Sequence, residues 1–420
     1  MNKICNAAFS TILILFLLGP ATLWLSQEKL HLDLPSWLTT EDAQYLAGGI
    51  ETTNLKSSLN FKGFFDGTLQ SGLEAKINNY TPSRANVILL NAALQQQAIK
   101  VSNALFSWNC YPTFYGSTIL YDHTSDTLLE SPFFSCNNGE ETLSDIDVFG
   151  ETLAGFAQDH QEIEFCVIIP ELREKSPINP AWDLVSQKFS ISSCSTLWSQ
   201  QSESLDNVHI IYDAYEDYTT YLENYYHFDP HWNGYGAIAS YNLAAEELEL
   251  PLLSQVPPAI ALDQYVFYGN LGRQGRMLID RPVSEPFVET EGFAVSNSIK
   301  GAMIRANNEV DPTESIYASF NFYAWLYGDD VASDIKNESA PSDETVLVIS
   351  DSFGDAFRWV VASRCRETHS LYSLHRSSKK DNVRLIHVIE RIKPTKIIFV
   401  GSIINYSTFL KRHPSYFTTN

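Results

Sequence analysis

Short apolar segments rich in β-branched residues constrain the fold of this 420-residue chain most strongly. They cover residues 163–169, 208–212, 346–349 and 396–400. Stretches with helical periodicity accompany them, at residues 143–159, 180–189, 195–202, 237–248, 356–363 and 383–392. A further short strand is predicted at 370–374. Strands that alternate with helices predict an α/β fold, with a parallel sheet covered by helices on both faces.

An acid and an imidazole lie two residues apart within the stretch YHFDPHWNGYGA, which covers residues 226–237. Pro230 separates Asp229 from His231 and disfavours a helical conformation at the residue before it. In an extended backbone, residues i and i+2 point to the same side, so the two side chains can meet. A carboxylate that binds the Nδ1–H of an imidazole leaves Nε2 free to act as a base. The pair therefore predicts two members of a catalytic triad.

The nucleophile of this triad is predicted at Ser352, in the stretch VLVISDSFGDAF of residues 346–357. The stretch combines a buried strand, a turn at 350–355 and the beginning of a helix. A serine at such a junction can have backbone N–H groups beside it that stabilise an oxyanion. Asp351 is expected to point away, because a carboxylate beside the nucleophile opposes oxyanion formation.

Two other interpretations of the acid and the imidazole remain open. Asp229 and His231 could form an ordinary pair in a surface loop, or they could bind a metal together with His227. No second cluster in the sequence supplies a convincing further metal ligand. We therefore expect neither a metal nor another cofactor and favour the catalytic interpretation.

The two motifs together resemble the AlgJ/AlgX-like alginate O-acetyltransferase family, which belongs to the SGNH-hydrolase superfamily. Asp-x-His-Trp at 229–232 and strand–Asp-Ser-Phe–helix around 351–353 carry the resemblance. Weaker similarities lie at 65–67, 268–272 and 327–337, so that roughly residues 40–410 are covered. The order acid, base, serine is permuted relative to most SGNH hydrolases, as it is in this group. One departure is Ser350, where such proteins usually have glycine.

The resemblance implies further site residues. An arginine and then a tyrosine after the nucleophile contact the acyl group or the sugar in such proteins, and Arg376 and Tyr406 match these positions. Asn405 is expected as an additional oxyanion donor, and Trp232 is assigned to the substrate-binding residues. The resemblance also implies that a membrane-bound acyltransferase partner delivers the acetyl group.

The first residues predict a membrane anchor. Residues 4–25 are mostly apolar, and about 20 such residues span a bilayer as a helix. Lys3 precedes the segment and acidic residues follow it, which predicts a cytoplasmic N-terminus and an exported chain. We favour an uncleaved anchor over a signal removed near residues 19–21. The expected organisation is an anchor at 1–26, a linker at 27–60 and an SGNH-hydrolase-like domain at 61–412 with an irregular insertion at 250–343.

Charge and cysteine content limit the partners and the compartment. The 28 basic and 50 acidic residues give a net charge of −22, which argues against nucleic acid and disfavours a polyanionic glycan. Cys110 and Cys136 lie in turn-rich, aromatic sequence and are the predicted disulfide pair of an exported domain. Cys166 lies within an apolar strand and is expected to be a small buried hydrophobic residue.

These observations favour a membrane-anchored, extracytoplasmic O-acetyltransferase that acts through a serine acetyl-enzyme. Its acceptor would be a polysaccharide, either an exopolysaccharide or a cell-wall glycan. A carbohydrate acetylesterase with the same triad is the first alternative, because both reactions share the acyl-enzyme. A non-catalytic glycan-binding scaffold is the second.

Overall fold

A computed structural model describes part of the chain. The described residues are 67–72, 84–106, 110–113, 116–122, 124–130, 139–173, 178–179, 191–262, 269–275, 283–286, 288, 292–296, 334–374 and 384–418. Contacts divide the chain into two compact units. The larger unit comprises Asn109–Pro112, Ser117–Leu271 and Asp280–Asn420. It contains the main sheet and the candidate site described below.

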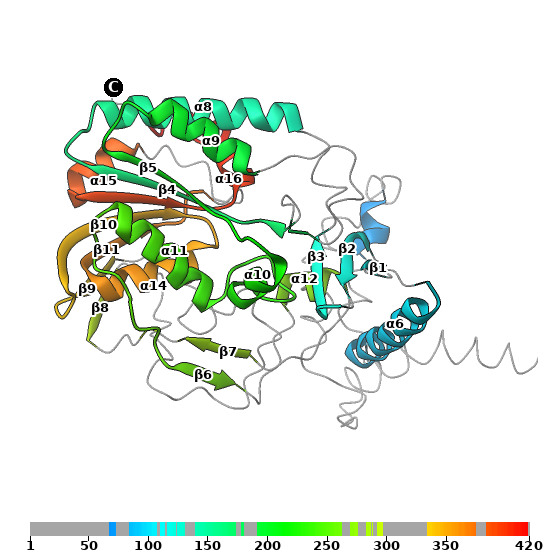
Figure 1. Cartoon of the computed structure of the whole chain (residues 1–420). Coiled ribbons are helices and arrows are strands. Elements are labelled where there is room, and N and C mark those ends of the chain that lie inside the picture. The colour runs from blue at the N-terminus through cyan, green and yellow to red at the C-terminus, as the bar shows by residue number, and fades with distance from the viewer. Residues whose placement is uncertain are drawn as a thin grey trace, which may run out of the picture. The chain divides into compact units, whose positions relative to one another are not determined.

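A seven-stranded sheet organises the larger unit, in the order β5-β4-β12-β10-β11-β9-β8 (Figure 1). The strands are β4 (Glu164–Pro170), β5 (Val208–Asp213), β8 (Phe293–Ser296), β9 (Asp334–Asn337), β10 (Ser342–Ser350), β11 (Cys365–Leu371) and β12 (Lys396–Val400). The pairs from β5 to β11 are all parallel, whereas β9 and β8 add two antiparallel strands at one edge. The predicted α/β architecture with a mostly parallel sheet is confirmed.

The central strands consist of continuous apolar runs because both of their faces are covered. All of β12 is buried, and so are the last five residues of β10, Val346 to Ser350. In the register, Val348 pairs with Ile398 of β12 on one side and with Ser370 of β11 on the other. Strand β10 therefore lies inside the sheet, and its carboxyl end is fixed from both sides.

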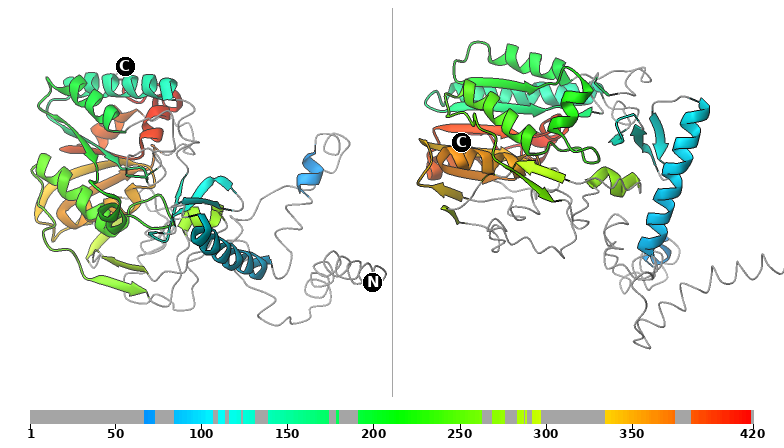
Figure 2. Two further views of the ribbon diagram at one scale, coloured as in Figure 1. Left: turned by 45° about the vertical axis from the view of Figure 1, so that its right-hand side comes forward. Right: turned by 60° about the horizontal axis from the view of Figure 1, so that its bottom comes forward.

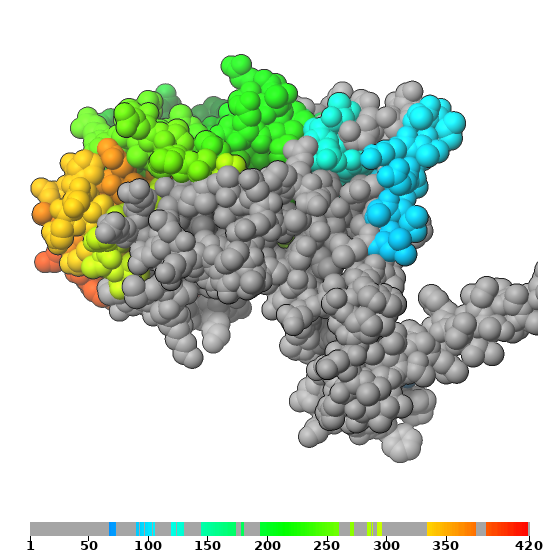
Figure 3. Space-filling model, turned by 90° about the horizontal axis from the view of Figure 1, so that it is seen from below, coloured from blue at the N-terminus to red at the C-terminus, as the bar shows by residue number. Residues whose placement is uncertain are grey.

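Helices cover both faces of the sheet (Figures 1 and 2). One face carries α8 (Gly139–Gln158), α9 (Ile191–Ser202) and α16 (Ile403–Arg412), and the other carries α11 (Gly234–Glu247) and α14 (Gly354–Arg364). The segments of α11 and α14 also lie side by side in the space-filling view (Figure 3). Helix α15 (Leu385–Ile392) connects β11 with β12.

The remaining elements are shorter or lie outside the main sheet. They are α6 (Arg84–Phe106), β1 (Cys110–Thr113), β2 (Gly116–Asp122), β3 (Thr127–Glu130), α10 (Tyr218–Asn224), β6 (Ala259–Leu262), α12 (Gly269–Gly275) and β7 (Val283–Pro286). β1 to β3 form a small sheet within the turn-rich, aromatic region that contains Cys110. The region 250–343 also contains strands, and two of them, β8 and β9, extend the main sheet.

Other predictions differ from the structure or fall outside the part it describes. The strand predicted at 370–374 is β11, which covers Cys365–Leu371, and α16 was not predicted as a helix. The proposed helix at 180–189, the anchor at 4–25 and Cys136 lie outside the described residues. No helix within the described ranges is long and apolar enough to cross a membrane. Cys166 is a buried free thiol, as expected.

Candidate active site

The acid and the base lie on a short loop whose two ends are held together by the backbone. Tyr225 and Trp232 form an antiparallel bridge, and the N–H of Tyr226 donates to the carbonyl of His231 at 3.2 Å. The N–H of Asn233 donates to the carbonyl of Asn224 at 2.9 Å. The loop therefore leaves α10 and enters α11 at almost the same place. Its residues 229–231 form the tip between these fixed ends.

Asn233 begins α11 directly after this loop. Its side chain accepts from the N–H groups of Tyr235 and Gly236, as an N-cap residue does. Gly234 and Gly236 thus lie inside the first turn of the helix, which begins before the range 237–248 expected from the sequence. A Cβ atom on Gly236 would lie 2.3 Å from the carbonyl oxygen of Asn224, so this close approach requires glycine.

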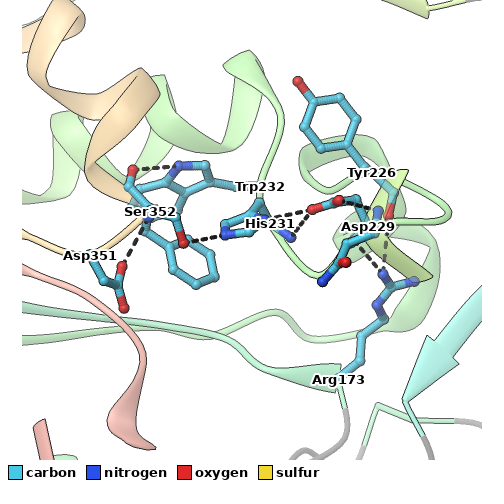
Figure 4. A network of polar contacts seen from close by, with 9 residues as sticks. Arg173, Tyr226, Asp229, His231, Trp232, Asp351 and Ser352 are labelled. Carbon is cyan, nitrogen blue, oxygen red and sulfur yellow. Dashed lines mark hydrogen bonds and ion pairs between the residues drawn. The ribbon is translucent and has the colours of Figure 1, made fainter. Parts of the chain in front are cut away.

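Asp229, His231 and Ser352 form one hydrogen-bonded chain (Figure 4). The Nδ1 atom of His231 lies 2.6 Å from Oδ1 of Asp229, and its Nε2 atom lies 2.6 Å from the hydroxyl oxygen of Ser352. The side chain of Asp229 is 1% exposed and that of His231 is 15% exposed. The base is therefore shielded but reachable. A serine, an imidazole and a carboxylate in this order can carry out nucleophilic acyl transfer.

Groups from two distant segments hold Asp229 in place. The N–H of Asn270 donates to Oδ2 of Asp229 at 2.7 Å, at the beginning of α12. Gly269 has a φ of +61°, and a Cβ atom there would lie 2.4 Å from the carbonyl oxygen of Phe228. Arg173, which follows β4, donates to the carbonyls of Tyr226 at 3.1 Å and Asp229 at 2.7 Å (Figure 4). The carboxylate and the backbone of the loop are thus fixed separately.

Asp351 shapes the turn that carries the nucleophile. Its Oδ1 atom accepts from the N–H of Phe353 at 2.9 Å. Its Oδ2 atom accepts from the N–H of Ser402 at 2.8 Å and from the side-chain amide of Asn405 at 2.7 Å. The carboxylate therefore links the end of β10 to the beginning of α16.

These bonds change the expected oxyanion donors. The N–H of Phe353 and the side-chain amide of Asn405 both donate to the Asp351 carboxylate, and the N–H of Gly354 donates to the Asp351 carbonyl at 2.9 Å. Asn405, the predicted oxyanion donor, uses one of the two hydrogens of its side-chain amide to bind Asp351. The two backbone groups that follow Ser352 are engaged in the same way.

Ser350 departs from the glycine that the sequence resemblance leads us to expect, and the structure shows how the chain accommodates it. Ser350 is the last residue of β10 and pairs with Val400. A Cβ atom on Gly354 would lie 2.0 Å from Oγ and 2.3 Å from Cβ of Ser350. The side chain of Ser350 thus occupies space that the absent side chain of Gly354 leaves open. Ser350 is also not among the described residues with a positive φ.

Trp232 has a different position from the predicted one. Its side chain is 2% exposed, and its ring packs edge-on against Phe353, with centroids 5.1 Å apart. Its indole N–H donates to the carbonyl of Phe353 at 3.1 Å. A buried indole with these contacts cannot contact substrate, so the assignment of Trp232 to the substrate-binding residues does not fit. It instead connects the loop that carries His231 to the turn that carries Ser352 through this hydrogen bond.

Tyr406 also lies away from a substrate surface. It is fully buried in α16, and its hydroxyl donates to the carbonyl of Ile168 at 3.1 Å. Its ring packs against Phe149 and Trp198, with centroids 5.1 and 5.3 Å apart. The predicted contact with the acyl group or the sugar does not fit this placement. Arg376, the other residue implied by the resemblance, lies outside the described residues.

Tyr372 contacts the nucleophile, although neither sequence motif singles it out. It follows β11, and its hydroxyl shares a hydrogen bond with the side chain of Ser352. Burial raises the pKa of the Tyr372 phenol above its usual range, and the carboxylates of Asp355 and Asp351 raise it further. The phenol therefore stays protonated. The parallel pairing of β10 with β11 is the signal that could have identified it, since Leu371 lies opposite Ile349.

The acidic surroundings keep His231 basic. Burial lowers the pKa of its imidazole, but the charge and hydrogen bond of Asp229 raise it, and so do Asp351 and Asp355. The net direction is upward from 6.5. His231 therefore needs a pH above this value to be largely neutral. Behind the loop, burial raises the pKa of Glu285 to about 8, and its carboxyl accepts from the N–H of Gly234 at 2.8 Å.

The alternative of a metal site at His227, Asp229 and His231 receives no support from the described part of the chain. No group of three or more histidine, cysteine, aspartate or glutamate side chains is placed there to hold a metal ion. The carbonyl of His227 accepts from the N–H of Leu128 at 2.8 Å. This bond connects the loop with β3.

The sequence matches no protein-family model and no curated protein, but the fold is similar to solved structures. A DHHW family protein from Eubacterium siraeum matches 72% of this chain and 98% of its own, with 13% identity and a TM-score of 0.51. Bacillus cereus PatB1 with a sulfonyl adduct matches 69% and 97%, with 16% identity and a TM-score of 0.47. The O-acetyltransferase domain of Pseudomonas putida AlgJ matches 71% and 93%, with 10% identity and a TM-score of 0.30. The first similarity extends to the fold alone.

Proposed function

We propose that this chain is a serine-dependent O-acetyltransferase that modifies hydroxyl groups of a glycan. The observation that carries the proposal is the position of His231, 2.6 Å from both the Asp229 carboxylate and the Ser352 hydroxyl. Such an arrangement lowers the barrier for acyl transfer by activating the serine. The restriction to acetyl groups and glycans comes from the two sequence motifs, which resemble those of alginate O-acetyltransferases.

In the first half-reaction, the Ser352 oxygen attacks the carbonyl carbon of an acetyl donor. Its proton passes to Nε2 of His231, while Asp229 stabilises the imidazolium that forms through Nδ1. Collapse of the tetrahedral intermediate expels the leaving group, which takes the proton from His231. The product is an acetyl ester on Ser352.

In the second half-reaction, a sugar hydroxyl attacks this ester, and His231 removes its proton. The acetyl group then leaves on the sugar, and Ser352 regains its hydrogen. Water in place of the sugar gives hydrolysis by the same steps. Acetylesterase activity is therefore the second candidate function, because the same arrangement of serine, histidine and aspartate can carry out both reactions.

Net charge and the N-terminal sequence support the proposed acceptor, location and acetyl donor. The net charge of −22 favours an acceptor that is not a polyanion. The apolar residues 4–25 and the charges around them favour an anchored, extracytoplasmic domain that receives its acetyl group from a membrane-bound acyltransferase. Arg376 keeps its proposed role as a contact to the acyl group or the sugar.

Hydrolysis of p-nitrophenyl acetate tests the proposed chemistry. We expect Ser352→Ala and His231→Ala each to lower kcat by several orders of magnitude, since the two residues act as a unit. Asp229→Asn should cost roughly 10⁴-fold, because the imidazole loses its orienting acceptor. The matched control is Ser363→Ala in α14, whose hydroxyl donates only to the carbonyl of Val360.

Intact-mass measurement after incubation with the ester should show one acetyl adduct that is absent from Ser352→Ala. Adding a neutral oligosaccharide separates the two candidate functions, because only the transferase forms acetylated sugar. A wild type that binds glycan but shows no serine-dependent turnover would support the scaffold alternative instead.

A further inference from the structure

We propose that Tyr372 is an oxyanion donor of this site. This inference rests on the proposed function, since an oxyanion forms only if Ser352 attacks an acyl group. Three observations lead to it: the contact between the two side chains, the direction of the hydrogen bond, and the engagement of the two backbone N–H groups that follow Ser352.

The sheet brings the two residues together. Ile349 of β10 lies opposite Leu371 of β11 in parallel register, so Tyr372 continues alongside Ser350 at the carboxyl edge. The N–H of Leu374 donates to the carbonyl of Ser350 at 3.1 Å and keeps the chain beside β10 after β11 ends. The phenol of Tyr372 thereby reaches the side chain of Ser352.

The direction of the bond follows from counting hydrogens. A serine hydroxyl has one hydrogen to donate and two lone pairs with which to accept. When Ser352 donates its hydrogen to Nε2 of His231, the hydrogen in the bond between Ser352 and Tyr372 must come from the phenol. Tyr372 is therefore a donor aimed at the nucleophilic oxygen in the state that precedes attack.

Attack moves negative charge to where this donor can stabilise it. As the bond from Ser352 Oγ to the carbonyl carbon forms, the carbonyl π electrons move onto the carbonyl oxygen, and the serine proton moves to His231. The new oxyanion is bonded to the same carbon as Oγ. A phenol within hydrogen-bond distance of Oγ is thus within reach of the oxyanion, and it keeps its own proton throughout.

The two backbone N–H groups that follow the nucleophile are used elsewhere. Phe353 N–H donates to the Asp351 carboxylate, and Gly354 N–H donates to the Asp351 carbonyl. Burial and the nearby carboxylates keep the Tyr372 phenol protonated, which a donor requires. The backbone N–H groups after Ser352 stabilise the turn, and the Tyr372 side chain supplies a donor beside the nucleophile.

Tyr372→Phe is the direct test, because it removes the hydroxyl and keeps the ring. Loss of one oxyanion donor typically lowers kcat by about 10²- to 10³-fold, and we expect this for p-nitrophenyl acetate with little change in KM. The matched control is Tyr406→Phe, which removes a hydroxyl that donates to the Ile168 carbonyl in the core. This control should lower the melting temperature without lowering kcat comparably.

Inhibition by methylboronic acid separates donation to the oxyanion from mere positioning of Ser352. Ser352 Oγ adds to boron, its proton moves to His231, and one boron hydroxyl takes the place of the oxyanion. The inhibition constant should rise in Tyr372→Phe by about the factor that kcat loses. An unchanged inhibition constant with a lower kcat would assign Tyr372 to positioning, and an unchanged kcat would remove it from the reaction.

A measurement without any variant covers the case in which Tyr372→Phe does not fold. In a crystal structure of the wild-type boronate adduct, the Tyr372 oxygen should lie about 2.5–3.0 Å from a boron hydroxyl. A different group at that position would overturn the assignment. A wild type without Ser352-dependent turnover would overturn the proposed function and the role of Tyr372 together, whereas an active wild type with an equally active Tyr372→Phe would overturn the latter alone.

Discussion

The indole of Trp232 donates to the carbonyl of Phe353 at 3.1 Å, so the residue after the base is bonded to the residue after the nucleophile. We expect Trp232→Phe to lower kcat/KM for p-nitrophenyl acetate by about 10- to 100-fold, because small displacements of reacting groups are costly. Trp198→Phe is the control, since that indole also donates to a backbone carbonyl, that of Ile146 at 2.7 Å. Equal activity losses in both variants would mean that general destabilisation, and not alignment, explains the effect.

The pH dependence of the reaction should reflect His231. The imidazole accepts a proton only when neutral, and its pKa is raised above 6.5 by Asp229, Asp351 and Asp355 despite burial. The rate should therefore rise with pH, with a midpoint of kcat/KM above 6.5. Initial rates corrected for the Ser352→Ala background measure this midpoint. A midpoint below 6.5 would show that burial, and not the surrounding carboxylates, dominates.

Glu285 should make the stability of the fold depend on pH. Burial raises its pKa from 4.5 to about 8, so between these values the folded state holds a proton that the unfolded state releases. The stabilisation is complete below pH 4.5 and is lost as the pH rises to about 8. Glu285→Gln cannot titrate and should flatten the melting temperature across this range.

The comparison between wild type and Glu285→Gln is cleanest from pH 6 to pH 8. Burial also raises the pKa of Asp213, from 3.8 to about 6, and this group acts in the same direction at lower pH in both proteins. If the melting temperatures of the two proteins change equally from pH 6 to pH 8, Glu285 is not the source of the pH dependence.

Positions 350 and 354 should show strong mutual dependence. Gly354→Ala places a methyl group onto the side chain of Ser350, and overpacking of this kind costs roughly 1–3 kcal/mol. Adding Ser350→Gly should restore much of the lost stability and activity, because the obstructing side chain is then removed. Urea unfolding of both single variants and the double variant measures the coupling. If the change in unfolding free energy of the double variant equals the sum of the two single changes, the side chains at positions 350 and 354 do not compete for the same space.

The strands that could be predicted are those whose sequences are uniformly apolar. β4 and β12 are buried on both faces, and this burial appears in the sequence as continuous apolar runs. β11 could not be located this way, because its sequence CRETHSL contains polar residues and only part of it is buried. It is a strand because β10 and β9 pair with it from either side, which is a tertiary effect.

In the site, too, contacts between residues close in the sequence could be predicted, whereas contacts between distant segments could not. The meeting of Asp229 and His231 follows from a spacing of two residues, so local geometry predicts it. The contributions of Arg173, Asn270 and Tyr372 depend on which segments the fold brings to one edge of the sheet. Tyr406 was assigned a substrate contact from its place in the sequence, whereas its neighbours in space make it part of the core.

The interior position of β10 makes the site a reporter of complete folding. Both strands that flank β10 follow it in the chain, and the carboxylate beside the nucleophile is held by Ser402 and Asn405, beyond the last strand. A chain released from denaturant can regain helices early, but it cannot align Ser352 with His231 until β12 has inserted. Recovery of esterase activity during refolding should therefore lag behind recovery of the far-ultraviolet circular dichroism signal and mark the closing of the sheet.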